Sequence, residues 1–151
     1  MAAMTTATQP APQPLLRQAT CVAIAGRALL IEGAPGTGKS SLALALIDRG
    51  AALVGDDGVS LTLSQGRLLA SPAPATRGLL EVRGLGLLPF EAISDIPVAL
   101  LLRLDTSAPR FIEGPAHESI AGLTLPVITL WPDSASLPLR AELALTHYGL
   151  P

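Results

Sequence analysis

Residues 33–40 contain the feature that most constrains the fold, the run Gly-Ala-Pro-Gly-Thr-Gly-Lys-Ser. This run matches the pattern of a phosphate-binding loop, in which glycines let consecutive backbone N–H groups curl around an anion. Such a loop works between a strand and a helix, because the partly positive helix N-terminus must face the same anion. The run therefore predicts a strand before residue 33, a helix from about residue 40, and a bound phosphate between them.

The segments on both sides of the loop fit this requirement. Residues 27–32 are a short apolar run of strand length, and residues 40–49 are rich in Ala and Leu, which favour helices. Gly50 follows at the position where a glycine commonly ends a helix. A glycine-rich turn that binds nothing is the alternative interpretation, but such a turn needs neither Lys39 nor Ser40.

Each part of the loop has an expected role in binding a nucleoside triphosphate such as ATP. Lys39, the only lysine in the chain, can reach the β- and γ-phosphates, and the Ser40 hydroxyl can hold Mg²⁺. The residues expected to bind the nucleotide are Gly33, Ala34, Pro35, Gly36, Thr37, Gly38, Lys39, Ser40 and Ser41.

The composition excludes several classes of protein. A net charge of −2, a pI of about 5.6 and the lack of a basic stripe argue against nucleic acid as the main partner. The single cysteine, Cys21, excludes an internal disulfide, fits a reducing cytoplasm, and lies in an apolar run that predicts a buried thiol. No apolar run approaches the roughly 18 residues of a membrane helix, and residues 1–18 lack the features of a signal peptide. We therefore expect a cytoplasmic protein that is not a membrane protein.

The chain of 151 residues fits one domain. Residues 1–17 are predicted to be a disordered tail, because this end of the chain is rich in Ala, Thr, Gln and Pro. Residues 18–151 are predicted to form a single kinase-type domain around the loop.

Most of the predicted secondary structure consists of strands. The segments that are apolar, or that alternate apolar and polar residues, are 20–24, 28–31, 52–54, 59–64, 67–70, 79–83, 97–104 and 125–130. The first two read as a hairpin, and 97–104 is apolar enough for a central strand buried on both faces. Residues 136–148 suit a helix, 108–118 a loop and 84–86 a bend. The pattern predicts a strand-rich α/β fold with a mixed sheet and hairpins, rather than the regular strand–helix alternation of common nucleotide-binding domains.

Asp56 and Asp57 form a second group of chemically active side chains. They follow the short strand after the predicted helix, which places them at the same sheet edge as the loop. One carboxylate there can hold Mg²⁺, and the other can accept a proton from an attacking hydroxyl. A solvated Asp-Asp-Gly turn is the alternative interpretation.

Glu81 and Arg83 lie two residues apart on one predicted strand, so both side chains face the same side. The glutamate can complete a metal site, and the arginine can neutralise phosphate charge. A surface ion pair between them is an equally good interpretation of the sequence.

Together these segments resemble the catalytic domain of bacterial HPr kinase/phosphorylase. The matching features are the loop at 33–40, Arg49-Gly50, Leu53-Val54, Asp56-Asp57, and the run Glu-Val-Arg-Gly-Leu-Gly at 81–86. Their order and spacing agree with the family over residues 18–88. The resemblance implies a P-loop kinase of the phosphoenolpyruvate carboxykinase-like type, with ATP and Mg²⁺ as cofactors and HPr, a phosphocarrier of the phosphotransferase system, as protein substrate.

The resemblance also assigns roles to individual residues. Lys39 and the loop hold the ATP phosphates, while Ser40 and Glu81 match Mg²⁺ ligands. The Asp-Asp pair supplies the base that deprotonates a seryl hydroxyl on HPr. We favour Asp57 for this role, with Asp56 as the alternative, and Asp57 is also counted among the metal ligands. Arg83 is the expected charge-neutralising catalytic residue.

This chain departs from the family pattern in three places. We expect no N-terminal domain before the loop, which would be similar to the short proteobacterial form of the family. Gln18 stands where the family usually has a histidine, and no Pro-Gly-Arg segment follows residue 90. We therefore expect kinase activity to exceed the reverse phosphorolysis. The resemblance also implies a homo-oligomer, while His117 and His147 match no family residue and are expected at the surface.

Two other functions fit the same residues. A small-molecule kinase would use the same loop and acids on a different hydroxyl acceptor. A non-catalytic ATP-binding regulatory module would bind the nucleotide without transfer, and Gln18 slightly favours this interpretation.

Overall fold

The computed structural model describes residues 13–132 and 134–151. The segments of this part of the chain that form regular structure are β1 (Leu15–Arg17), β2 (Thr20–Ile24), β3 (Arg27–Gly33), α1 (Lys39–Asp48), β4 (Ala52–Gly55), β5 (Val59–Ser64), β6 (Arg67–Pro72), the short 3-10 helix η2 (Pro74–Thr76), β7 (Leu79–Val82), β8 (Gly86–Pro89), β9 (Ile96–Leu104), β10 (Ala116–Ile120), β11 (Leu123–Leu130) and α2 (Leu137–Tyr148). No helix among these residues is long and apolar enough to cross a membrane.

The strands form one large mixed sheet with a separate hairpin. Within the described residues the sheet has the order β1-β5-β6-β9-β3-β2-β4, with β11 beside β9 and β10 beside β11. β9 runs parallel to both β3 and β11, while β2 pairs antiparallel with β3 and with β4. β3, β4, β9 and β11 therefore all end at the same edge of the sheet. The segments that follow them start from that edge, as the phosphate loop requires.

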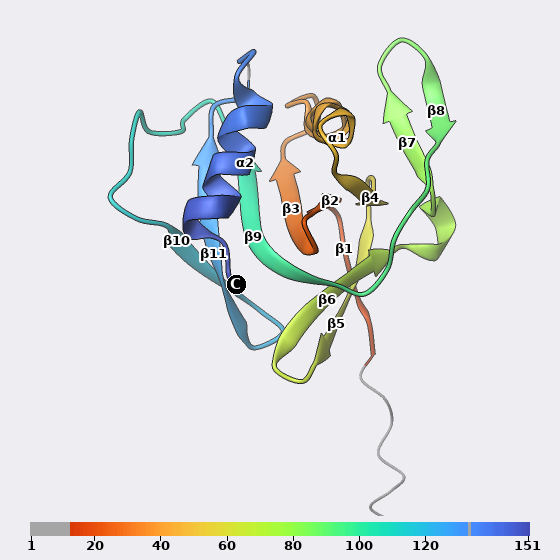
Figure 1. The fold of residues 1–151 in the computed structure, drawn as a ribbon, viewed down its shortest axis with the longest axis horizontal. Helices are drawn as coiled ribbons and strands as arrows, with labels where there is room; N and C mark the ends of the chain where they lie inside the picture. The colour runs from red at the N-terminus through yellow and green to blue at the C-terminus, as the bar shows by residue number, and fades with distance from the viewer. Residues whose placement is uncertain (1–12, 133) are drawn as a thin grey trace, which may run out of the picture.

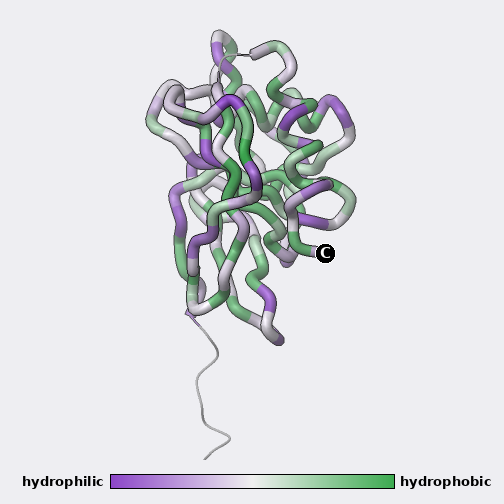
Figure 2. Tube along the Cα trace, turned by 90° about the vertical axis from the view of Figure 1, so that its left-hand side faces the viewer, coloured by the Kyte–Doolittle hydropathy of each residue, from purple (hydrophilic) through white to green (hydrophobic). Residues whose placement is uncertain are grey.

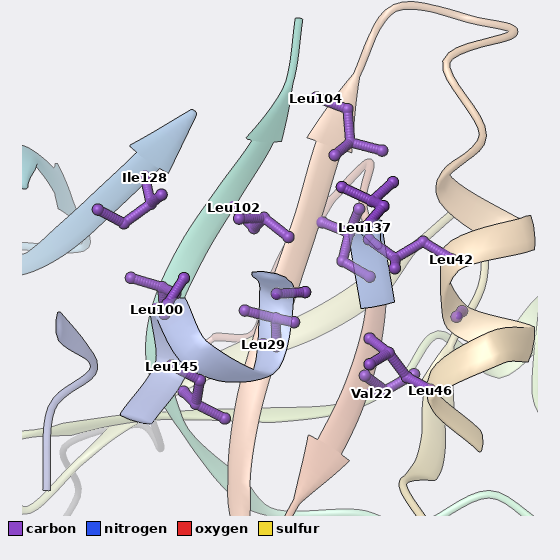
Figure 3. Packing of buried hydrophobic residues seen from close by; sticks show 14 of the residues in the cluster. Val22, Leu29, Leu42, Leu46, Leu100, Leu102, Leu104, Ile128, Leu137 and Leu145 are labelled. Atoms are coloured by element: carbon purple, nitrogen blue, oxygen red, sulfur yellow. The ribbon is translucent and has the colours of Figure 1, made fainter. Parts of the chain in front are cut away.

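The two helices cover one face of this sheet (Figure 1). Leu42 and Leu46 of α1 and Leu145 of α2 pack with sheet residues such as Leu29 and Leu102 in one buried cluster. Figure 3 shows these side chains pointing toward one another. On the exposed side Arg49 bridges the helices through an ion pair to Glu142, at 2.9 Å. α1, whose N-terminus faces the phosphate loop, is thus fixed to the core along its length.

The other face of the sheet is covered by strands. A second buried cluster joins Cys21 and Leu30 of the central strands to Leu61 of β5, Leu68 of β6 and Ile120 of β10. The sheet is consequently buried on both faces, and the apolar character of β9 follows from this position. In the tube view, hydrophobic residues are concentrated in the interior of the molecule (Figure 2). The predicted burial of Cys21 is confirmed, and this burial raises the pKa of its thiol.

Two of the expectations from sequence were wrong, and a strand after the expected bend at 84–86 was missed. Leu15–Arg17, assigned to the disordered tail 1–17, form β1 and pair with β5, whereas residues 1–12 lie outside the described part. The end of the expected loop at 108–118 forms β10, which pairs with β11. The expected bend at 84–86 is the turn of a hairpin, and β8 returns along β7. Each missed strand is short or lies at a sheet edge, where little burial shows in the sequence.

The C-terminal end of α1 lies where the sequence predicted it. Gly50 has φ of 110°, in the region that favours glycine, and its N–H donates to the Ile47 carbonyl. The Ala51 N–H donates to the Leu46 carbonyl at 2.9 Å. These two bonds form a Schellman motif, which ends α1 after three turns and directs the chain into β4. β4 then brings Asp56 and Asp57 back to the loop.

Candidate phosphate-binding site

The loop between β3 and α1 has the backbone conformation of an anion cradle. A Cβ on Gly33 would lie 2.6 Å from Thr37 Oγ1 and 2.9 Å from the Leu104 carbonyl oxygen, so only glycine fits where the loop passes β9. Gly38 has φ of 92° directly before the helix. The glycines are therefore required by the path of the chain, as the motif predicts.

The N-terminus of α1 faces this loop with free backbone donors. The first helical hydrogen bond runs from the Leu42 N–H to the Gly38 carbonyl at 2.9 Å. The N–H groups of Lys39, Ser40 and Ser41 consequently have no acceptor within the helix. These donors and the positive end of the helix dipole favour an anion at this position.

The Lys39 side chain folds back across the loop. Its ammonium donates to the Gly33 carbonyl at 2.8 Å and to the Ala34 carbonyl at 3.2 Å. The charge therefore lies above the start of the loop, opposite the first turn of the helix. This position suits a cation that contacts the outer phosphates of a nucleotide.

Asp56 joins three segments at the base of the site. Its side chain is only 5% exposed, and Oδ1 accepts hydrogen bonds from Ser40 Oγ at 2.7 Å and Thr20 Oγ1 at 3.0 Å. Oδ2 accepts the backbone N–H of Glu81 at 2.9 Å. A buried carboxylate is retained when such donors satisfy both oxygens. Asp56 thus positions the loop serine, β2 and β7 relative to one another.

Asp57 has a different environment from its neighbour. It is exposed, has φ of 58°, and its Oδ1 accepts a long hydrogen bond of 3.5 Å from the Gln18 amide. A carboxylate with free lone pairs at the mouth of the site can accept a proton, whereas Asp56 already has three donors. The sequence favoured Asp57 for the base, with Asp56 as the alternative, and this geometry also favours Asp57. For the metal, however, Asp56 is the carboxylate that contacts Ser40.

Glu81 and Arg83 lie at the same hollow as the loop and the two aspartates, which has a volume of about 490 Å³. Both side chains are exposed, and within the described residues they form no ion pair with each other. Arg83 follows the end of β7 on a hairpin that stands beside α1 (Figure 1). Both charges therefore remain available to a ligand in the hollow.

The oxygen ligands at the loop suit Mg²⁺ only when a bound phosphate supplies further ligands. No cluster of three or more His, Cys, Asp or Glu side chains that could hold a metal occurs among residues 13–132 and 134–151. The Ser40 hydroxyl beside Asp56, with Glu81 nearby, supplies hard oxygen ligands but not a complete set. Mg²⁺ in proteins is commonly bound by a few protein oxygens together with the phosphates of a substrate, and these residues suit that kind of site.

A charged network beside the loop was not anticipated from the sequence. Arg17 of β1 donates to Glu32 at 3.1 Å and to Glu118 at 2.7 Å, and Arg103 of β9 pairs with the same Glu118. Hydrogen bonding to Glu32 raises the pKa of Arg17. Burial alone would raise the pKa of Glu118, but the two arginines hold it below its ordinary value. The one sequence signal was Glu32, a charge on an apolar strand directly before the loop.

Comparison with protein families matches residues 12–95 to the model of the HPr serine kinase C-terminal domain. The matched segment contains the loop, both aspartates and the β7–β8 hairpin. This chain belongs to the HPr serine kinase C-terminal domain family. The resemblance drawn from the motifs is confirmed.

Individual relatives of this family extend the match. HPr kinase/phosphorylase of Bordetella pertussis is 38% identical over 119 residues, which is 78% of this chain and 38% of that protein. The enzyme of Clostridium tetani is 48% identical over 67 residues, 44% of this chain and 22% of that protein. The chain thus spans well under half the length of these curated relatives.

A solved structure shows that the fold is shared. The Hpr(Ser) kinase/phosphatase from Coxiella burnetii superposes with a TM-score of 0.77 at 29% identity, covering 88% of this chain and 95% of that chain. The expected mixed α/β fold with a strand-rich sheet is thereby confirmed. His117 and His147 are both exposed, as expected.

Proposed function

We propose that this protein is an ATP-dependent kinase that phosphorylates a seryl hydroxyl of an HPr-type phosphocarrier. The observation that carries the proposal is the position of Asp56, which joins the loop serine to the Glu81 segment and leaves the neighbouring Asp57 exposed in the same hollow. A phosphate cradle and a free carboxylate in one hollow are the two parts that phosphoryl transfer to a hydroxyl needs. The proposal includes the P-loop kinase type similar to phosphoenolpyruvate carboxykinase.

In the proposed mechanism the amides at the start of α1 hold the inner phosphates of ATP. The Lys39 ammonium leaves the Gly33 and Ala34 carbonyls to contact the outer phosphates, exchanging weak acceptors for charged ones. Mg²⁺, held by Ser40 with Asp56 or Glu81 nearby, would neutralise charge on the phosphate oxygens when bound. Asp57 then accepts the seryl proton, and Arg83 stabilises charge on the transferring group.

The charged network supports the expected direction of the reaction. Phosphorolysis requires inorganic phosphate beside a phosphoserine, and the repulsion between these anions must be offset by positive charge. Arg17 and Arg103 lie beside the loop, but each is paired with Glu32 or Glu118. Their charge is thus largely used within the protein. We infer that the forward reaction dominates and that phosphorylase activity is secondary.

The location and assembly of the protein follow from the same proposal. ATP and phosphocarrier proteins are cytoplasmic reactants, so the cytoplasm remains the predicted location. The homo-oligomer implied by the family stays a prediction. So does the expectation that neither nucleic acid nor a membrane is a partner.

The experiment that tests the proposal mixes the protein, γ-labelled ATP, Mg²⁺ and purified HPr, and follows the label. Label on a serine of HPr is the expected result. Label on an added small hydroxyl compound in place of HPr would support the small-molecule kinase. Binding of ATP without transfer to any acceptor would support the regulatory module and contradict the kinase.

A further inference from the structure

Two further hollows adjoin the phosphate site on different sides of the loop. The first, here called the β1 hollow, has a volume of about 670 Å³ and is lined by Leu15, Leu16, Gly33, Ala34, Arg103 and Thr106, among others. The second, the α1 hollow, has a volume of about 460 Å³ and is lined by Ser41, Leu42, Arg83, Ala135 and Pro138, among others. A bound nucleotide can extend into one of them, which leaves the other for the phosphoryl acceptor.

The loop itself shows which hollow faces the outer phosphate. The free amides at the start of α1 include that of Ser41, which lines the α1 hollow, and such amides hold the α- and β-phosphates. The Lys39 ammonium, which reaches the β- and γ-phosphates, lies instead over Gly33 and Ala34, which line the β1 hollow. The phosphate chain therefore runs from the α1 hollow toward the β1 hollow.

In-line transfer then places the acceptor. The attacking and leaving oxygens lie on opposite sides of the transferred phosphorus, so an acceptor must approach from the side away from the nucleoside. Gln18 lines both the phosphate site and the β1 hollow, and its amide contacts Asp57, the candidate base. The β1 hollow is thus continuous with the place where the seryl proton must be removed.

The lining of the β1 hollow suits a protein surface better than a small polar metabolite. Leu15 and Leu16 of β1 are 45% and 69% exposed, although β1 is paired on one side with β5. The side chain of Arg103, paired with Glu32 and Glu118 but still 41% exposed, lies at the opposite wall, and Asp105 and Thr106 add polar groups. Apolar contacts flanked by polar and charged groups are typical of protein–protein interfaces.

We propose that the β1 hollow is the docking surface for the acceptor protein, and that an apolar patch beside its reactive serine covers Leu15 and Leu16. This inference rests on the proposed kinase function and adds the side from which its protein substrate binds. The main competing surface is the apolar groove of Phe111, Trp131 and Leu143 between α2 and the segment after β9. That groove shares no residue with the phosphate site and has no continuity with Asp57.

The test compares acceptor kinetics of two β1-hollow variants with a matched control. Leu16→Asp removes an exposed leucine from β1, and Thr106→Arg narrows the opposite wall without touching that strand. Leu143→Asp, at a leucine that is 56% exposed in the competing groove, is the control. With HPr as the acceptor, we expect both hollow variants to raise the KM for HPr about tenfold. Their KM for ATP and their unfolding midpoint should stay at wild-type values, as should every parameter of the control.

The outcomes separate this inference from the proposed function. Transfer by the wild type with an unchanged KM for HPr in Thr106→Arg, or an increase only in Leu143→Asp, would overturn the docking surface while leaving the kinase intact. An increase in the KM for ATP in place of that for HPr would also overturn it, because the β1 hollow would then hold the nucleoside. No transfer to HPr by the wild type would refute the proposed function first, and this inference with it.

Discussion

The segments before and after residue 95 contribute different things to the same site. Residues 13–95 contain the loop, the aspartate pair and the β7–β8 hairpin, and the family match ends with them. Residues 96–151 contain β9, β11 and α2, whose inward side chains are mainly apolar, with Leu100, Leu101 and Leu102 fully buried. The first segment supplies the polar groups, and the second supplies much of the core on which they rest.

The two segments nevertheless depend on each other. β9 lies between β3 and β11, and its Leu104 carbonyl lies so close to Gly33 that a side chain there would not fit. The position of the phosphate loop is therefore set in part by a strand without a catalytic residue of its own. Substitutions in the first segment should affect chemistry more than stability, and substitutions in the second should do the reverse.

The largest expected effect on chemistry is that of Lys39→Ala. This change removes the cation that contacts the outer phosphates, so phosphoryl transfer to HPr should be abolished. The fold should persist, because the side chain is exposed and bonds only to two loop carbonyls. Labelled-ATP assays and circular dichroism melting check both parts. Transfer at the wild-type rate would show that the loop does not act on the phosphates.

The two aspartates should respond differently to the same substitution. Asp57→Asn should lower the transfer rate by about 10²–10⁴-fold, the usual contribution of a positioned base, with nucleotide affinity retained. Asp56→Asn should also weaken nucleotide binding and stability. Asn has only one acceptor oxygen, so either the Ser40 hydroxyl or the Glu81 N–H would face an amide nitrogen that cannot accept its hydrogen bond. Calorimetric titration with ATP separates the cases. A loss below tenfold in both variants would remove the pair from catalysis.

In the second segment, Leu102→Ala should mainly affect stability. The side chain is fully buried between the helices and the sheet, and such truncations cost about 2–5 kcal/mol. For a domain of this size the unfolding midpoint should fall by roughly 5–15 °C. Below that midpoint the variant should still transfer phosphate. Leu16→Asp, on the exposed face of β1, is the stability control, and an equal loss in both would contradict the assigned burial.

The smallest effect expected is on the acid side of the stability profile. Glu118 joins the segments through Arg17 and Arg103, and its pKa is lowered in the folded protein. A lowered carboxylate pKa stabilises the fold fully above the ordinary value of 4.5, and this contribution is lost as the pH falls through the lowered pKa. Glu118→Gln should therefore destabilise the protein at neutral pH and have less effect in acid. Urea unfolding at several pH values tests this, and a pH-independent difference would contradict it.

The sequence predicted the parts of the fold in which local pattern and burial coincide. The apolar run 97–104 is the buried central strand β9, and the loop motif identified both its strand and its helix. β1 and β10 were missed because they lie at edges of the sheet, where their mostly exposed side chains show no clear alternation, and β1 pairs with the distant strand β5. The hairpin strand β8 was missed for the same reason, with Leu87 exposed.

At the site, the sequence identified residue types but not their division of labour. Asp56 and Asp57 are adjacent residues of the same type. Only the path of the chain after β4 makes Asp56 buried and Asp57 exposed. The network of Arg17, Glu32, Arg103 and Glu118 joins four elements, so no local spacing could reveal it. Long-range geometry thus supplied what the motif lacked.

The most direct test of this division measures transfer to HPr and the unfolding midpoint on the same preparations of wild type, Lys39→Ala and Leu102→Ala. The account predicts a crossed result, in which Lys39→Ala keeps the wild-type midpoint and loses transfer, while Leu102→Ala loses stability and keeps transfer below its midpoint. A Lys39→Ala protein that transfers phosphate, or a folded Leu102→Ala protein that does not, would contradict it.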